Sequence, residues 1–588
     1  MDDILTIEQL LQAYQSGTVS VRTLLSEKWQ QAKQDEHHSW ISLISEQQLE
    51  NYLSHLEQFS VEDLPLYGVP FAIKDNIDLA GLNTTAGCRE YSYAPDESAF
   101  VVALLIEAGA VPLGKTNLDQ FATGLVGTRS PWGETRNSFN PEYISGGSSA
   151  GSAVSVATNQ VFFSLGTDTA GSGRVPAAFN NLFGLKPTKG LLSCSGVVPA
   201  CKSLDCVTLF TRAASDLAIL HKVVAVYDNQ DCYARPYLPS SSQVPNAFSG
   251  LKVGVPSASQ LEFFGNAEYQ AGFESAVAKL AALGAELVEF DLEPFLQAAK
   301  LLYQGPWVAE RYAAIQAFFD QDSSRCLPVI ETIIGGAKSI SAADTFNAMY
   351  QLQAYKVICD ERLSCVDVVI TPTAGSTYTI ADVNADPITL NSNLGYYTNF
   401  MNLLDYAALA IPSSFCPSGL PFGFTLFAPA HSDSALIALA DAWQQQSGLP
   451  LGATGKYLPQ QYVMDVLVCG AHMQGLALNH QLLELGGVLK SHTRTSANYR
   501  FYALGGEGIA RPGLVRDESS DSTIDVEVWQ LPVANVGKLL AQIPHPLGLG
   551  KVELACGEWV SGFICEPSGL NSATEITQFG GWRQYMDA

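Results

Sequence analysis

Three residues of this chain have the types and the spacing that acyl transfer needs. Lys74 ends an apolar run, and Ser148 and Ser172 lie in two glycine-rich segments, 146–151 and 168–173. A serine hydroxyl attacks a carbonyl only when a base removes its proton, and neither segment contains the histidine that usually does so. The glycines allow backbone N–H groups to approach a reacting carbonyl. The sequence therefore predicts a serine nucleophile with a lysine as its base.

The first glycine-rich segment allows two other interpretations. Residues 147–151 match the G-x-S-x-G elbow of α/β-hydrolases, with Ser149 at the centre. That elbow follows a buried strand, whereas residues 137–145 have the composition of a loop. A flexible Gly-Ser linker is the second alternative. A phosphate-binding loop is excluded because no Gly-Lys-Ser/Thr follows.

Composition limits the class of protein. The chain has 588 residues, of which 47% are apolar and 15% charged, and this predicts a globular protein with a large core. Its net charge of −26, without a basic cluster, argues against nucleic acid or an anionic membrane as a partner. No secretory signal or membrane-spanning run is apparent, so we expect a cytoplasmic protein. The twelve cysteines form no C-x-x-C pair, which predicts reduced thiols and no zinc site.

Patterns of apolar residues predict the elements that position the three residues. We expect two initial helices, the first from a capping box of Thr6 and Gln9 and the second after Ser20. Between residues 68 and 186, short apolar runs alternate with helical stretches, which is typical of a sheet covered by helices. A strand, a helix and a strand follow over residues 251–290, and a buried strand is predicted at 366–370.

The chain is predicted to contain two domains, 1–443 and 463–588. They are separated by a Gln-, Gly- and Pro-rich linker at 444–462. We expect the second domain to be mainly β, with strands at 464–469, 498–504 and 523–529, a helix at 533–543 and a hairpin at 551–566.

The order and spacing of Lys74, Ser148 and Ser172 resemble the amidase signature family, whose members hydrolyse amides with a Ser-cisSer-Lys triad. The resemblance implies an α/β fold with a mixed central sheet covered by helices. It also implies Lys74 as the base, Ser148 as a proton relay after a cis Gly147–Ser148 bond, and Ser172 as the nucleophile. The oxyanion hole would be formed by the backbone N–H groups of Thr169, Ala170, Gly171 and Ser172. No cofactor or metal ion is implied.

A further stretch resembles the allophanate hydrolases within that family. Residues 303–311 read Tyr-Gln-Gly-Pro-Trp-Val-Ala-Glu-Arg, and Tyr303, Arg311 and Gly124 match positions that contact substrate in that group. A guanidinium binds a carboxylate with two hydrogen bonds, which suits a small anionic substrate; the alternative is that Arg311 forms a structural ion pair. The resemblance implies cleavage of allophanate (urea-1-carboxylate) to ammonia and N-carboxycarbamate, then to carbon dioxide and a second ammonia. It also implies a homodimer that is functionally coupled to urea carboxylase.

The last part of the chain, at 468–480 and 579–582, resembles the carboxy-terminal domain of allophanate hydrolases. This implies a γ-glutamylcyclotransferase-like fold, but residues 545–550 replace the catalytic glutamate of cyclotransferases, so that activity is not expected. The polar candidates for the later decarboxylation step are His472, His492, Arg494 and Tyr499, each with a structural alternative. Three other functions stay open at this point: the amidase subunit of a tRNA-dependent amidotransferase, an amidase of other specificity, and an inactive scaffold.

Overall fold

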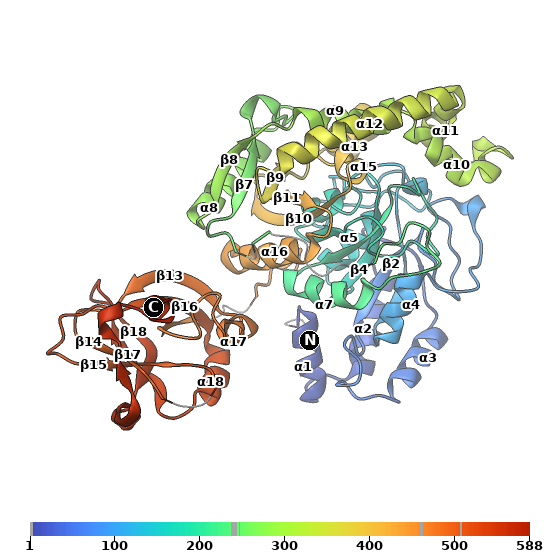
Figure 1. Cartoon of the computed structure of the whole chain (residues 1–588). Coiled ribbons are helices and arrows are strands. Elements are labelled where there is room, and N and C mark those ends of the chain that lie inside the picture. The colour runs from blue at the N-terminus through green and yellow to red at the C-terminus, as the bar shows by residue number, and fades with distance from the viewer. Residues whose placement is uncertain (1–3, 237–243, 246, 459–462, 506–507) are drawn as a thin grey trace. The chain divides into compact units, whose positions relative to one another are not determined.

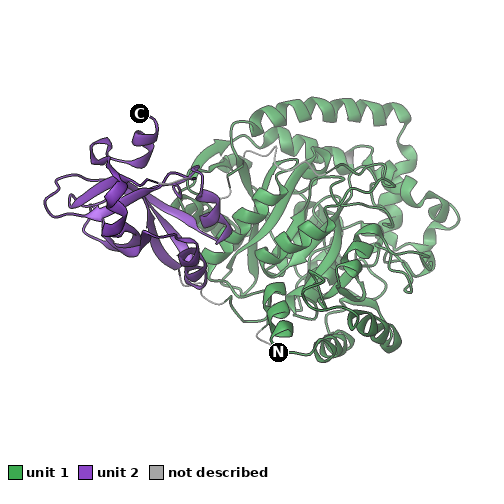
Figure 2. Ribbon diagram, turned by 60° about the horizontal axis from the view of Figure 1, so that its bottom comes forward, with its two compact units in different colours: residues 1–458 green, residues 459–588 purple. Residues whose placement is uncertain are grey.

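The structure is a computed structural model that describes residues 4–236, 244–245, 247–458, 463–505 and 508–588. It forms two compact units, 1–458 and 459–588 (Figures 1 and 2). The expected linker at 444–462 is only partly extended, because helix α16 (Asp433–Ser447) enters it. The carbonyl oxygens of Pro450 and Gly452 also accept hydrogen bonds from Asn181 in unit 1.

Within its described residues, unit 1 contains a mixed sheet of eleven strands in the order β1-β3-β2-β4-β6-β5-β10-β11-β9-β7-β8. Strand β2 lies between β3 and β4 and is parallel to both, whereas β4 and β6 are antiparallel. The strands are β1 Trp40–Leu43, β2 Pro70–Lys74, β3 Val111–Thr116, β4 Phe163–Asp168, β5 Phe183–Lys186, β6 Cys206–Thr211, β7 Lys252–Pro256, β8 Glu286–Phe290, β9 Val368–Pro372, β10 Tyr406–Phe415 and β11 Pro421–Pro429.

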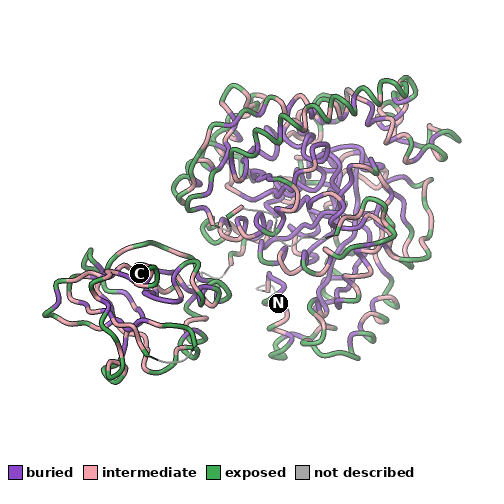
Figure 3. Tube along the Cα trace, in the orientation of Figure 1, coloured by how far each residue is buried: buried purple, intermediate pink, exposed green. Residues whose placement is uncertain are grey.

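Helices cover both faces of this sheet (Figure 1). Successive residues of β10 show this, because Tyr406 and Ala408 join one apolar cluster whereas Ala407 and Leu409 join another. The deepest burial of unit 1 accordingly lies in and beside the sheet (Figure 3). The helices are α1 Ile7–Gln15, α2 Val21–Lys33, α3 Glu46–Leu56, α4 Phe100–Glu107, α5 Ala150–Ala157, α6 Val175–Phe179, α7 Ala214–Val224, α8 Ala267–Ala282, α9 Glu293–Gln304, α10 Trp307–Phe319, α11 Pro328–Gly335, α12 Ala342–Leu363, α13 Ile380–Ala385, α14 Thr389–Leu394, α15 Asn399–Leu403 and α16.

Several predicted elements of unit 1 are confirmed. The capping box of Thr6 and Gln9 begins α1, and Ser20 precedes α2 but makes no side-chain cap bond. The expected strand, helix and strand correspond to β7, α8 and β8, with the two strands parallel. The buried strand predicted at 366–370 begins later, as β9, because Val366 still belongs to the turn after α12.

Unit 2 is mainly β, as predicted. Its described residues form a five-stranded sheet in the order β13-β16-β12-β18-β17 and a three-stranded sheet in the order β15-β14-β19. Three strands were not predicted, because β13 is mostly exposed and polar, β15 begins with Pro-Gly and β19 has only two residues. The elements are β12 Val463–Val468, α17 Asn479–Glu484, β13 Val488–Arg494, β14 Tyr499–Ala503, β15 Pro512–Arg516, β16 Asp525–Pro532, α18 Val533–Gln542, β17 Leu547–Glu553, β18 Trp559–Cys565, β19 Thr574–Glu575 and α19 Trp582–Met586.

Candidate active site

Lys74 is the last residue of β2, a fully buried strand that is third from the β1 edge of the larger sheet. Its Nζ atom lies 2.7 Å from Ser148 Oγ and 2.8 Å from Thr167 Oγ1, which belongs to β4. Burial lowers the pKa of Lys74 to about 7, although the charges of Asp119, Asp205 and Asp168 act in the opposite direction. The structure thus places a lysine that is largely neutral above pH 7 against a serine hydroxyl.

Ser148 lies in the loop that leads into α5, and the predicted cis Gly147–Ser148 bond is present. A side chain at Gly147 would place its Cβ 2.2 Å from Asp119 Oδ2, so only glycine fits there. Ser149 is the N-cap residue of α5, and its Oγ donates to Thr167 O at 3.1 Å. Among the described residues, no strand leads directly into this segment and no base reaches Ser149. The elbow interpretation is therefore wrong.

Ser172 is buried in the loop after β4, and its Oγ lies 3.5 Å from the carbonyl oxygen of Gly124. The structure records no hydrogen bond from Ser172 to Ser148, so the relay is not closed in this conformation. The predicted oxyanion hole needs one correction, because the N–H of Gly171 donates to Asp168 Oδ1 at 2.8 Å. In the described part of the chain, the N–H groups of Thr169, Ala170 and Ser172 have no acceptor.

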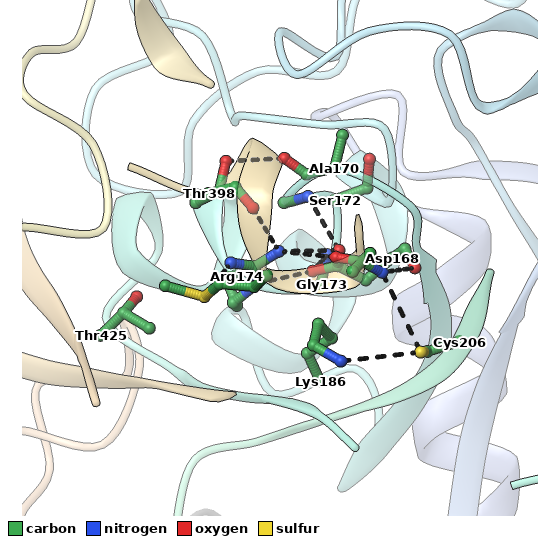
Figure 4. Close-up of polar contacts among 12 residues, drawn as sticks. Asp168, Ala170, Ser172, Gly173, Arg174, Lys186, Cys206, Thr398 and Thr425 are labelled. Carbon is green, nitrogen blue, oxygen red and sulfur yellow. Dashed lines mark hydrogen bonds and ion pairs between the residues drawn. The ribbon is translucent and has the colours of Figure 1, made fainter. Parts of the chain in front are cut away.

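A buried ion pair supports the loop that carries Ser172 (Figure 4). Arg174 Nε and Nη2 each lie 2.9 Å from the carboxylate of Asp168. Burial raises the pKa of Asp168, but Arg174 and backbone N–H groups outweigh this and keep it below its usual value. Thr398 Oγ1 in turn donates to Ala170 O at 2.6 Å. Arg174 directly follows the glycine-rich segment 168–173, so the sequence could have suggested its ion pair with Asp168, whereas nothing in the sequence pointed to Thr398.

Arg311 approaches the same region from α10. Its guanidinium is buried and donates to Thr123 Oγ1 at 3.1 Å and to Ala122 O at 3.3 Å, and it lies 3.4 Å from the hydroxyl of Tyr303 on α9. Over the residues that the structure describes, no carboxylate lies within 4 Å of it. The structural ion pair is therefore wrong as an interpretation of Arg311. Gly124, which follows Thr123, links this arginine to Ser172.

Comparisons with known proteins agree with this geometry. Residues 21–437 match the family model described as Amidase, and residues 464–587 match that of the allophanate hydrolase C-terminal domain. The chain belongs to the amidase family.

Two groups of relatives bear on its function. It is 44% identical over 594 residues to a urea amidolyase of Lachancea kluyveri, a match that covers 97% of this chain and 32% of that protein, so it spans about a third of this relative. A solved structure of Kluyveromyces lactis allophanate hydrolase has 41% identity and a TM-score of 0.77, with both chains fully covered. In the second group, the A subunit of the glutamyl-tRNA(Gln) amidotransferase of Methanosarcina barkeri is 33% identical over 420 residues, which covers 65% of this chain and 85% of that protein.

In the second unit of this amidase, the four polar candidates do not come together. His472 lines a cavity of about 60 Å³ with the polar side chains of Gln481 and Arg511. Its Nε2 lies 2.9 Å from Gln481 Oε1, and burial lowers the pKa of His472. Arg511 was not predicted from the sequence, because it is distant along the chain from any recognised motif.

The other three candidates lie outside the lining of that cavity. Tyr499 is buried and its hydroxyl accepts a hydrogen bond from the backbone of Glu553, whereas Arg494 forms an ion pair with Asp525 at 2.6 Å. The side chain of His492 is 63% exposed. None of the described helices, in either unit, is long and apolar enough to cross a membrane.

Proposed function

We propose that this chain hydrolyses allophanate by a Ser-cisSer-Lys acyl-enzyme mechanism. The observation that carries the proposal is the buried guanidinium of Arg311, which has no carboxylate partner among the described residues and adjoins the segment that contacts Ser172. Burial lowers the pKa of Arg311, but Tyr303, Cys201 and the more distant carboxylates of Asp205 and Glu310 raise it above its usual value, so the guanidinium stays charged. Because none of these carboxylates contacts it, its donors are available to a small anionic substrate. Allophanate has a carboxylate at one end and an amide at the other.

In the proposed reaction, neutral Lys74 takes the proton of Ser148, which takes the proton of Ser172. Ser172 Oγ must first turn from Gly124 O toward Ser148. It then forms a bond to the amide carbonyl carbon, and the oxyanion accepts hydrogen bonds from the backbone N–H groups of Thr169, Ala170 and Ser172, because the N–H of Gly171 is bound to Asp168. Removal of one such donor typically costs about 10²–10³ in rate. Ser148 returns the proton to the leaving nitrogen, ammonia departs, and water releases N-carboxycarbamate from Ser172.

The carboxylate end of the substrate is assigned to Arg311 and Tyr303. Both side chains reach the site from the helix pair α9 and α10, and the contacts of Arg311 there, at 3.1–3.4 Å, are with neutral oxygens. A ligand carboxylate would form stronger, charge-assisted hydrogen bonds with the same guanidinium. Gly124 contributes through its backbone, since a Cβ there would lie 2.6 Å from Asp119 Oδ2.

For the second unit, we propose a γ-glutamylcyclotransferase-like fold and a role in the loss of carbon dioxide and the second ammonia. In support, the chain after β12 forms a glycine-containing turn at Gly470 beside the cavity of His472. Backbone N–H groups of such turns can hold a carboxylate. His472 and Arg511 are our first candidates, because they line the cavity that His492, Arg494 and Tyr499 do not.

The wider context is also a proposal. We expect residues 1–443 and 463–588 to act as separate domains of a cytoplasmic homodimer. The similarity to urea amidolyases supports a functional coupling to urea carboxylase in the degradation of urea.

The test is a comparison of ammonia release from allophanate, biuret, glutamine and a long-chain fatty amide, with the Ser172→Ala variant as control. We expect allophanate to be the preferred substrate and the variant to be inactive on all four. Preference for glutamine would favour an amidotransferase component instead, and preference for the fatty amide would favour an amidase of other specificity. Failure of a fluorophosphonate to label Ser172 would indicate an inactive scaffold.

A further inference from the structure

A second buried arginine, Arg129, lies behind the segment that Arg311 contacts. Its side chain is nearly inaccessible, with the whole residue 4% exposed. Nη1 donates to the carbonyl oxygen of Thr123 at 2.8 Å and Nη2 donates to the carbonyl oxygen of Pro387. The third nitrogen, Nε, is buried without a hydrogen-bond partner among the described residues. A buried guanidinium with an unsatisfied donor lowers the stability of the fold, so its presence calls for a functional explanation.

The charge of Arg129 is not neutralised by direct contact. No carboxylate lies within 4 Å of its guanidinium in the part of the chain that the structure describes. Asp119 is close enough to influence it, but that carboxylate accepts hydrogen bonds from the backbone N–H groups of Val126, Gly127 and Arg129 itself. Burial lowers the pKa of Arg129, Asp119 and Tyr303 raise it, and Arg311 lowers it further. The two guanidiniums therefore influence each other within one buried region.

Both arginines hold the same residue by different atoms. Arg311 binds the side chain of Thr123, and Arg129 binds its carbonyl oxygen. The next residue, Gly124, offers its own carbonyl oxygen to Ser172. Loss of Arg129 would thus affect two things: the position of residues 122–124, and the positive electrostatic potential around the guanidinium of Arg311.

We infer that Arg129 is a specificity-determining and positioning residue, whose charge acts with that of Arg311 to select amides that end in a carboxylate. The inference rests on the proposed function, because it concerns the anionic end of that substrate. Arg129 is not expected to touch the reacting atoms. Its effect should therefore appear in the preference for an anionic over a neutral substrate of the same size, rather than in the acylation chemistry.

The test compares allophanate with biuret, in which a neutral amide replaces the carboxylate. Arg129→Gln removes the charge and retains a donor for Thr123 O. Arg136→Gln makes the same change of net charge at an exposed position and is the matched control. The readout is the kcat/KM for allophanate divided by that for biuret. If biuret is not turned over, the readout is the KM for allophanate divided by the inhibition constant of biuret.

We expect Arg129→Gln to reduce the preference for allophanate about ten-fold or more, the order expected for a unit charge at roughly 10 Å with an effective dielectric constant near 20. Arg136→Gln should leave it unchanged. Equal losses with both substrates would show a purely structural role and overturn the inference, as would an unchanged preference. If Arg129→Gln does not fold, Arg129→Lys replaces it, and a preference lost despite the retained charge would also overturn the inference. A wild-type enzyme inactive on allophanate would instead refute the proposed function itself.

Discussion

The lowered pKa of Lys74 makes the strongest quantitative prediction, which concerns the reactivity of Ser172 as a function of pH. Only the neutral amine can accept the proton of Ser148. With a pKa of about 7 instead of 10.5, about half of the Lys74 side chains are neutral at pH 7. An unperturbed lysine would be neutral in roughly one molecule in 3,000 at that pH. Burial of this single side chain thus raises the fraction of neutral lysine at pH 7 by about three orders of magnitude.

The same shift predicts how stability depends on pH. Because the pKa is lower in the folded state, the unfolded chain binds more protons between pH 7 and 10.5. The contribution of Lys74 to the free energy of unfolding therefore rises with pH across this window, by about 5 kcal/mol in total if the whole shift is realised. Lys74→Met should remove this slope along with activity.

The assay is the rate at which a small fluorophosphonate labels Ser172 between pH 5.5 and 9.5, because the probe carries no carboxylate and bypasses Arg311. We expect the labelling rate to reach half of its maximum near pH 7 and to fall ten-fold for each pH unit below that midpoint, in a single acidic limb. Asp205→Asn is the control for the assignment. The charge of Asp205 raises the pKa of Lys74, so its removal should move the limb to lower pH whatever it does to the maximal rate. A limb above pH 9, or a flat profile, would refute Lys74 as the base.

Three further predictions follow from the site and the two units. Ser172→Ala should lower allophanate hydrolysis by at least about 10³-fold without changing the thermal midpoint, and retained activity would assign the nucleophile elsewhere. Arg311→Lys should raise KM for allophanate by an amount equivalent to about 1–3 kcal/mol, and an unchanged KM would contradict the carboxylate contact. Residues 1–458 alone should release the first ammonia at the rate of the full chain but the second more slowly. Equal rates for both would indicate that decarboxylation is spontaneous.

The boundary of that shortened chain shows where sequence reasoning needed the structure. A chain ending at residue 446, inside the expected linker, would lose the buried Leu451 and both carbonyl oxygens that bind Asn181. Composition indicated a linker because glycine, proline and glutamine are frequent there. It could not show that part of the segment packs on the amidase unit, since that depends on a residue about 270 positions earlier.

The proposed catalytic residues were accessible from the sequence because each lies in a local motif. Lys74 ends a strand that its apolar run predicts, and the two serines lie in glycine-rich loops whose composition reflects tight backbone approach. The groups that hold these loops were not accessible. Thr398 and Arg129 do not lie in a recognisable sequence motif. Gly171 was predicted to be an oxyanion donor, but in the structure its N–H donates to Asp168. Local spacing predicts reactive groups, but it does not show which backbone donors stay free, because side-chain contacts such as that of Asp168 with Gly171 decide this.

Arg311 and Lys74 are also coupled, and this coupling should appear in the kinetics. The charge of Arg311 lowers the pKa of Lys74 in the free enzyme. A bound carboxylate would neutralise that charge, so the pKa of Lys74 should be higher when allophanate occupies the site. The acidic limb of kcat, which reports the complex, should therefore lie above that of kcat/KM, which reports the free enzyme. Biuret lacks the carboxylate and should show no such separation. Coincident limbs with allophanate would mean that its carboxylate does not bind at Arg311.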